Sequence, residues 1–525
     1  MSTLWKNTFT KTAAVLSHGF ETSLFGSLMR RLGGSYYESA AGRLLNRDLV
    51  RQSRTYGILL DITGRLEKLF TQNNPAKSRL AGAVWYGSLL ALVMSVVLAF
   101  IFLTWVQASI ALVAVLAVAA VLYRAEFGLY IAALVMPFVA FKALFLLSLL
   151  TLASFFLSVL NGSRRCDFYL SPVMVPLLLF YLVMCYGTVT SVWFFPSLSE
   201  FLIPVTGLLY LLAAVNTLDT REKLDNFIFL LAVAGMITAC YAIYQYYSGA
   251  SILEMKKEWV DIARNPDIQN RAYAVFENPN LLAQYLILLG TLSIGSMFGA
   301  ARRGRQFFYA TTAAVAVFCL VLTFSRGGYI AFAFALLVFA VFKNRPLLPV
   351  FTLGGLIVYS FLPRAIMLRL STITSMKDSS SLYRLDTWQS TMSLIKSHWE
   401  TGVGLGRNAF SRVYYTHMIK SNVVPHSHNL YLQIISEFGI LGLAVFTWLF
   451  LALFKLGLKL YSAGKKYIID LNAAVMGALA GFLVHSTVDY FLWYYKIAIF
   501  IWLLVAILLI LEKLTLGQTS PERTG

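Results

Sequence analysis

Hydrophobic runs recur along the chain from Ala81 to the C-terminus, and they constrain the fold more than any other feature. Each run, of about 17–25 residues, is long enough to cross a hydrocarbon layer about 30 Å thick as an α-helix. The chain is 58% hydrophobic and 13% charged, against about 45–50% apolar and about 25% charged residues in soluble domains. Because the alternating pattern of an outer-membrane barrel is absent, we predict an all-α, polytopic transmembrane helix bundle with a large extracytoplasmic loop.

The runs predict about 12–14 spans. The candidates are 81–105, 107–123, 127–141, 143–160, 169–187, 198–216, 224–247, 280–299, 306–323, 327–342, 347–362, 429–454, 471–491 and 496–512.

Basic residues mark every second connector, as the positive-inside pattern requires. We therefore expect a multi-pass protein of the cell (cytoplasmic) membrane with a cytoplasmic N-terminus. The basic residues of the expected inner connectors are Arg124, Arg164, Arg165, Arg221, Lys223, Arg302, Arg303, Arg305, Lys343, Arg345, Lys455, Lys459, Lys465 and Lys466.

Three regions are expected. Residues 1–80 form a basic region, predicted to be amphipathic helices on the inner leaflet, with a solvated basic tail as the alternative. The membrane domain is 81–512, with extracytoplasmic loops at 248–279 and 363–428, and 513–525 is a cytoplasmic tail. The second loop holds eight basic and three acidic residues, which favours an anionic ligand. Because the formal charge of +19 is spread over connectors, no nucleic-acid partner is expected.

Polar residues that are unusual in such a chain gather on the predicted outer side. Arg326 lies in FSRGGY between two apolar runs, and Arg271 lies shortly before the helix start expected near Asn280. Arg384 lies in SLYRLDTW, and the segment PHSHNLYLQ, with His428, leads into the next helix. An arginine at a helix end commonly extends to the headgroups, which is the alternative interpretation for Arg326.

Other polar and glycine residues there have simpler interpretations. Gly402, Gly404 and Gly406 lack the following Lys-Ser/Thr of a phosphate cradle, so they are interpreted as turn formers. His426 and His428 have no carboxylate or cysteine at ligand spacing, so we expect no metal ion. A continuous helix would place Glu437 about 13 Å deeper, on the opposite face. We expect it to bind a neighbouring helix.

Several arginines and a titratable histidine on one side suit a diphosphate-bearing lipid. Guanidinium groups hold phosphate in a bidentate manner and stay charged, and imidazole can move a proton near neutral pH.

The motifs resemble the bacterial O-antigen ligase and O-antigen polymerase family of lipid-linked glycan transferases. The resemblance covers about 270–500 and rests on NPNLLA at 278–283, SRGG at 325–328, RLDTW at 384–388 with GVGLG at 402–406, and HSHNLYLQIISEFGILG at 426–442. The basic N-terminal region departs from the family pattern, and so does the high number of spans.

The resemblance implies transfer of a glycan from a polyprenyl-diphosphate carrier to an acceptor at the outer face of the membrane. It also implies that His428, Arg384 and Arg326 are catalytic. His428 would be the general base, and the arginines would stabilise the leaving diphosphate. Further substrate-binding candidates are Arg271, Asn280, Ser325, Arg364, His426 and Asn429, with Asn429 expected to orient the imidazole. No cofactor or metal ion is expected. The expected partners are the lipid-linked donor, membrane lipids, and a glycan, lipid or protein acceptor.

Two questions stay open at this point. A transporter of lipid-linked glycan shares the many helices, although such proteins usually carry ionisable residues near mid-membrane. Within the enzyme class, the sequence does not separate a polymerase, a ligase onto a lipid core and an O-linked protein oligosaccharyltransferase.

Overall fold

The fold is all-helical, in a computed structural model that describes residues 105–160, 171–250, 270–360, 367, 379–419, 424–462 and 465–517. Every regular element within these ranges is a helix, so the predicted all-α class is confirmed. The expected region 1–80, Arg364 and most of the predicted span 81–105 lie outside the described residues, as do the greater part of the 248–279 loop and most of the tail.

Among the described residues, nine helices are long and apolar enough to cross a membrane. They are α9 (Phe141–Leu160), α11 (Phe194–Thr217), α12 (Arg221–Tyr247), α14 (Pro279–Gly299), α15 (Arg303–Leu322), α16 (Arg326–Lys343), α21 (Leu430–Ser462), α22 (Lys466–His485) and α23 (Tyr495–Gly517). Shorter apolar helices are α7 (Trp105–Tyr123), α8 (Glu126–Val135), α10 (Met174–Val189) and α17 (Leu347–Ser360).

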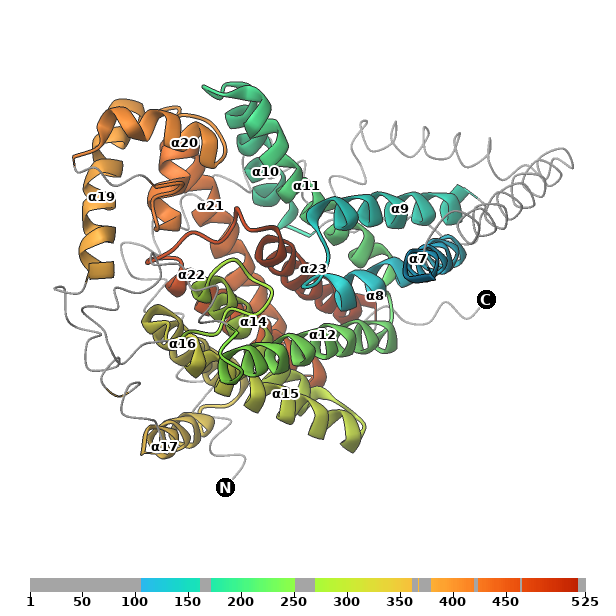
Figure 1. Cartoon of the computed structure of the whole chain (residues 1–525). Coiled ribbons are helices and arrows are strands. Elements are labelled where there is room, and N and C mark those ends of the chain that lie inside the picture. Colours follow the sequence, from blue (N-terminus) through green and yellow to red (C-terminus); the bar gives the residue numbers. More distant parts are fainter. Residues whose placement is uncertain are drawn as a thin grey trace, which may run out of the picture. The chain divides into compact units, whose positions relative to one another are not determined.

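Three helices form the interior of the bundle. The apolar windows of α14, α22 and α23 are 83%, 78% and 89% buried, and α23 runs between α11, α21 and α22 (Figure 1). Gly477 and Gly481 let α22 approach α16 closely, because a Cβ at Gly481 would press against Ala335 and the Ala331 carbonyl. Small residues four positions apart are a common way for membrane helices to pack.

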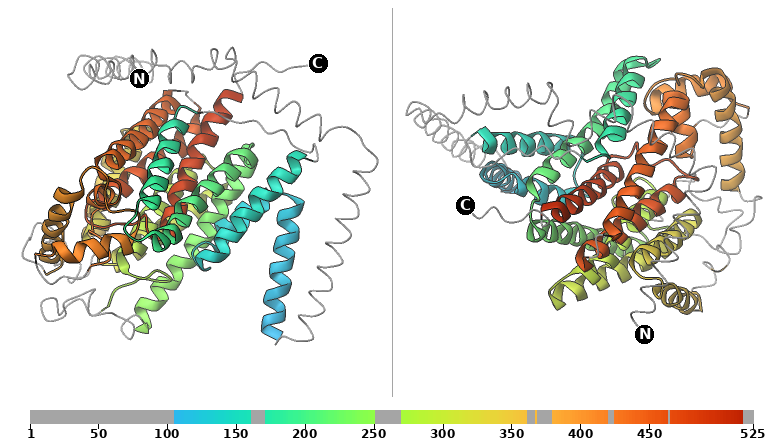
Figure 2. Two further views of the ribbon diagram at one scale, coloured as in Figure 1. Left: turned by 90° about the horizontal axis from the view of Figure 1, so that it is seen from above. Right: turned by 180° about the vertical axis from the view of Figure 1, so that it is seen from behind.

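The predicted loop at 363–428 contains structure of its own. It carries α19 (Ser379–His398), α20 (Arg407–Tyr414) and the short 3-10 helix η1 (Tyr415–His417). α19 and α20 lie beside α21 (Figure 2). A small apolar core that includes Leu394, Phe410 and Tyr414 holds them together.

A glycine-rich junction joins this segment to α21. Gly402, Gly404 and Gly406 all have positive φ, as their interpretation as turn formers requires. The amide of Gly404 donates to the Glu437 carbonyl at 3.1 Å, and the amide of Val403 donates to Ser436 at 2.8 Å. Two backbones therefore lie side by side with no room for side chains between them.

Gly439 breaks α21 at the same place. Its φ of 67° and ψ of −168° are not helical, and a Cβ there would overlap the Glu400 carbonyl. The amide of the next residue, Ile440, donates to the Trp399 carbonyl at 2.8 Å instead of to its own helix. The break thus fixes α19 against the beginning of α21.

Candidate active site

A chain of hydrogen bonds runs through four polar side chains at one end of the bundle: Ser325, Asn280, Asp489 and His428. Ser325 Oγ donates to Asn280 Oδ1 at 3.0 Å, and Asn280 Nδ2 donates to Asp489 Oδ2 at 3.0 Å. His428 Nδ1 lies 3.1 Å from Asp489 Oδ1. The chain of bonds joins the beginnings of α14, α16 and α21 to the connector between α22 and α23.

Asp489 determines which nitrogen of His428 carries a proton. Burial alone would raise the pKa of Asp489, but the hydrogen bond and charge of His428, with the charges of His426 and Arg384, hold that pKa well below its usual range. Asp489 is therefore an ionised acceptor, so His428 Nδ1 must be the donor. In the neutral form of the ring, the lone pair is then on Nε2, the nitrogen able to accept a proton. The His428 side chain is 23% exposed, which leaves it partly accessible.

The backbone is strained in the segments that form this cluster. Within the described chain, the residues other than glycine with positive φ are Ala274 (51°), Phe324 (52°) and His428 (51°). Ala274 precedes Asn280, and Phe324 comes directly before Ser325. Each such residue costs about 1–3 kcal/mol, and strain of this kind concentrates at functional sites. The rest of the fold must hold the cluster in place.

The predicted arginines lie around the same cluster. Arg271 is 6% exposed. Its Nε donates to the Thr323 carbonyl at 2.8 Å, and its Nη2 lies 3.4 Å from Asn280 Oδ1. Arg326 Nη2 donates to Ser381 Oγ at 3.3 Å, which links the first turn of α16 to α19.

Arg384 follows Ser381 by three residues on α19. Residues spaced in this way are neighbours on one helix face. The charge of Arg384 also acts on the Asp489 carboxylate. The structure therefore links Arg326 to α19 and brings Arg384 close to the Asp489 carboxylate that binds His428.

Three helix N-termini meet at the cluster. Asn278 caps α14, and its Oδ1 accepts from the amides of Asn280 and Leu281. Ser325 caps α16 by accepting from the amide of Gly328, and Asn429 Oδ1 accepts from two amides of the first turn of α21. The positive ends of three helix dipoles attract an anion.

One predicted residue, Asn429, has contacts other than those expected. Asn429 Nδ2 donates to the Thr487 carbonyl at 2.9 Å, so Asn429 positions the α22–α23 connector and caps α21. It is Asp489 that binds the His428 imidazole. Nothing in the sequence indicates that pairing, apart from a single acidic residue in the aromatic connector DYFLWYY.

His426 is buried behind His428. It is 5% exposed, and its ring stacks on Trp493 with centroids 5.8 Å apart. Its Nδ1 accepts from the His428 amide at 3.2 Å. Burial lowers the pKa of His426 well below its ordinary value, and the nearby charge of His428 lowers it further. His426 is thus a neutral support for the loop that carries His428.

Glu437 fixes the connector from the other side. Its Oε1 accepts from Gln433 Nε2 at 2.9 Å and from the Tyr490 hydroxyl at 3.4 Å. Tyr490 follows Asp489 directly, so this contact holds the carboxylate that binds His428. Glu437 was expected to bind a neighbouring helix, whereas these contacts are with Gln433 of its own helix and with Tyr490 of the connector.

Among the described residues, His426, His428 and Asp489 offer ligand atoms close enough together to hold a metal ion, all within 4.8 Å of one another. Both Asp489 oxygens and His426 Nδ1 already accept hydrogen bonds from within the chain. Asp489 is thus the nearby carboxylate that the sequence around the two histidines lacks, and part of the hydrogen-bonding capacity of this group is already used within the chain.

Comparison with known families gives one match. Residues 311–447 match the family model described as O-antigen ligase. No curated protein matches the chain. The matched range contains Ser325, Arg326, Arg384, His426 and His428, whereas Asp489 lies beyond it. The nine apolar helices among the described residues support a multi-pass membrane protein. The family match supports an O-antigen ligase-like function. The resemblance found in the motifs is therefore confirmed for residues 311–447, which are similar to the O-antigen ligase family.

Proposed function

We propose that this protein is a membrane glycosyltransferase that moves a glycan from a polyprenyl-diphosphate carrier onto an acceptor hydroxyl, at the extracytoplasmic face of the cytoplasmic membrane. The observation that carries the proposal is the His428–Asp489 pair, set among arginines and three helix N-termini. An ionised partner leaves His428 Nε2 ready to take a proton, and the positive groups around it suit a diphosphate.

The reaction follows from these groups. His428 Nε2 takes the proton of the acceptor hydroxyl as the hydroxyl oxygen attacks the anomeric carbon of the donor sugar. The bond between that carbon and the diphosphate oxygen breaks, and the lipid diphosphate leaves with the electron pair. Arg326 and Arg384 stabilise the charge that gathers on the leaving group, in the way a metal ion does in other transferases. Arg271 and Asn280 hold this end of the bundle rigid.

The test is a transfer assay with the purified full-length protein, a lipid-diphosphate-linked glycan and an acceptor. We expect His428→Ala and Arg384→Ala each to reduce transfer at least about a hundredfold. Arg303→Gln, at the opposite end of the bundle, is the matched control and should retain activity. Wild-type turnover by His428→Ala would refute the assignment, and lost activity after metal chelation would refute metal-independent catalysis.

A second experiment determines the class of acceptor. In a deletion strain, electrophoresis of surface glycans separates the options. Single repeat units that are still attached indicate a polymerase. Lipid-linked polymer that accumulates without attachment indicates a ligase, and loss of glycan from proteins alone indicates an O-linked protein oligosaccharyltransferase. Movement of unchanged lipid-linked glycan across the membrane would instead identify a transporter.

A further inference from the structure

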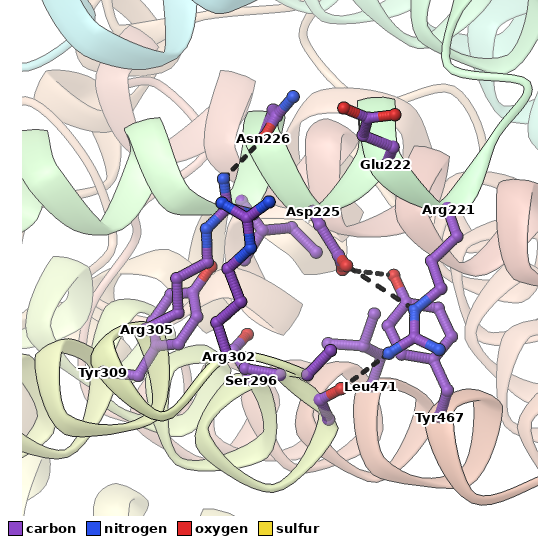
Figure 3. Close-up of a pocket in the computed structure, with 14 residues that line it drawn as sticks. Arg221, Glu222, Asp225, Asn226, Ser296, Arg302, Arg305, Tyr309, Tyr467 and Leu471 are labelled. Carbon is purple, nitrogen blue, oxygen red and sulfur yellow. Dashed lines mark hydrogen bonds and ion pairs between the residues drawn. The ribbon is translucent and has the colours of Figure 1, made fainter.

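A second polar site lies at the opposite end of the same bundle. A cavity of about 470 Å³ opens there between the first turns of α12, α15 and α22 and the last turn of α14 (Figure 3). The active-site cluster lies at the other ends of α14 and α22, where Asn280 is in the first turn of α14 and Asp489 is in the connector that follows α22. The two sites are therefore separated by the length of these helices.

The cavity is lined by three guanidinium groups. Figure 3 shows Arg302 and Arg305 on one side of it and Arg221 beside Tyr467 on the other. Arg305 Nη2 donates to Asn226 Oδ1 at 2.6 Å, a neutral partner. Across the described part of the chain, no carboxylate lies within ion-pair distance of Arg302. Two positive groups of α15 thus share one cavity with no carboxylate within ion-pair distance of either.

The acidic residues of the lining balance this charge only in part, because the charge of Asp225 is shared between Arg221 and Arg305. Asp225 accepts from the Tyr467 hydroxyl at 2.6 Å and lies 3.6 Å from Arg221 Nε. It is therefore engaged in positioning Arg221, whose Nη2 also donates to the Gly299 carbonyl at 3.1 Å. Glu222 is exposed, and Figure 3 shows its carboxylate directed away from Asp225.

A buried hydroxyl provides an independent sign of a ligand. Ser296, on the last turns of α14, lines the cavity and is 4% exposed. Its Oγ has no hydrogen-bond partner among the described residues. Most serines within a helix donate to the carbonyl four residues earlier, as Thr291 does here. A buried hydroxyl without a partner is costly unless a ligand or water satisfies it.

We propose that this cavity binds a phosphate group through Arg302, Arg305 and Ser296. Guanidinium groups match phosphate oxygens in geometry and charge. The N-termini of α12 and α15 add two helix dipoles of the same sign. The cavity lies where membrane helices end, which is the depth of lipid headgroups. The phosphate belongs to a phospholipid headgroup or is free in solution, and this site is distinct from the one proposed for the diphosphate donor.

The experiment measures the thermal unfolding midpoint of the full-length protein in two settings. In an uncharged detergent, inorganic phosphate is titrated at constant ionic strength with chloride as the reference anion. In nanodiscs, phosphatidylcholine alone is compared with a mixture that contains phosphatidylglycerol. Arg302→Gln removes one guanidinium of the cavity. Arg303→Gln, whose residue does not line the cavity, removes the same charge one position away and is the control.

We expect stabilisation that saturates with phosphate or with phosphatidylglycerol. The apparent affinity should fall about tenfold or more in Arg302→Gln and about three- to tenfold in Ser296→Ala, which removes a hydroxyl but no charge. Arg303→Gln should match the wild type. A response to phosphate in detergent identifies a free anion, and a response to phosphatidylglycerol alone identifies a lipid headgroup. The proposal is overturned by the absence of both responses, or by equal losses in Arg302→Gln and Arg303→Gln.

Discussion

The two ends of the bundle use the same residue types in different ways. At the end with His428, polar side chains are bonded to one another, and the backbone is strained in three places. At the end with Arg302, guanidinium groups surround a cavity, and a buried hydroxyl has no partner among the described residues. A site built for chemistry needs its groups held in place before the substrate arrives. A site that only binds a ligand can contain polar groups whose hydrogen bonds are made only when the ligand is present.

The strongest test of this contrast is Asp489→Asn. The amide can no longer hold the His428 tautomer as an anion does, so we expect kcat to fall about a hundredfold to ten-thousandfold with little change in KM. The pH profile of kcat should also shift, which a purely structural loss would not cause. Asp219→Asn, an exposed carboxylate at the other end, should leave the kinetics unchanged. Equal kinetics for Asp489→Asn and wild type would remove the proposed role of the pair.

A second test concerns what holds the active end rigid. Gly439→Ala places a Cβ against the Glu400 carbonyl at a φ of 67°. We expect a loss of about 3 kcal/mol or more in unfolding free energy. Thermal unfolding would measure it, and limited proteolysis would report release of α19 and α20. Gly354→Ala is the control, because nothing lies within 4 Å of its added Cβ. Equal thermal unfolding midpoints for Gly439→Ala and Gly354→Ala would show that the break at Gly439 does not hold α19 against α21.

The third test separates charge from geometry at Arg384. Lysine keeps the positive charge but loses the planar fork that binds two phosphate oxygens. We expect Arg384→Lys to lower transfer about tenfold to a hundredfold, mainly through the leaving-group step. Lys396→Arg, the opposite change at an exposed position of the same helix, should have no effect. Full activity of Arg384→Lys would mean that Arg384 contributes only its positive charge and not bidentate hydrogen bonding to the phosphate.

The smallest expected effect is a pH dependence from His426. Its folded-state pKa is lowered from the ordinary value of 6.5, mainly by burial. Below about pH 6.5 the unfolded chain therefore binds a proton that the folded chain does not, and stability falls as the pH drops. We expect the thermal midpoint to decline between pH 7 and pH 5 in the wild type and to decline less in His426→Gln. A parallel decline in both would exclude His426 as the cause.

Hydrophobic runs predicted the helices well, because length and composition determine which segments can lie in a membrane. The motifs centre on Arg326, Arg384 and His428, which the structure brings to one end of the bundle, and their catalytic roles stay a prediction. Asp489 was missed because its partner is 61 residues away and nothing local to the connector indicates the contact. The break at Gly439 was missed for a similar reason, since the segment is apolar and helical in pattern on both sides.

The cavity at the opposite end was missed for another reason. Arg302 and Arg305 belong to a basic connector, and basic connectors are expected wherever a chain follows the positive-inside pattern. The sequence therefore explains their charge completely without any ligand. Only the packing of α12, α14, α15 and α22 reveals that the arginines share a cavity with a buried Ser296.

The position of Asp489 has a consequence for the order in which the site is made. His428 is synthesised 61 residues before its partner, and α21 and α22 must both enter the membrane between them. A chain interrupted between residues 428 and 489 carries the arginines and the imidazole but no carboxylate to orient that imidazole. We therefore expect nascent chains of this protein to stay inactive until α22 has been inserted and Asp489 has been synthesised.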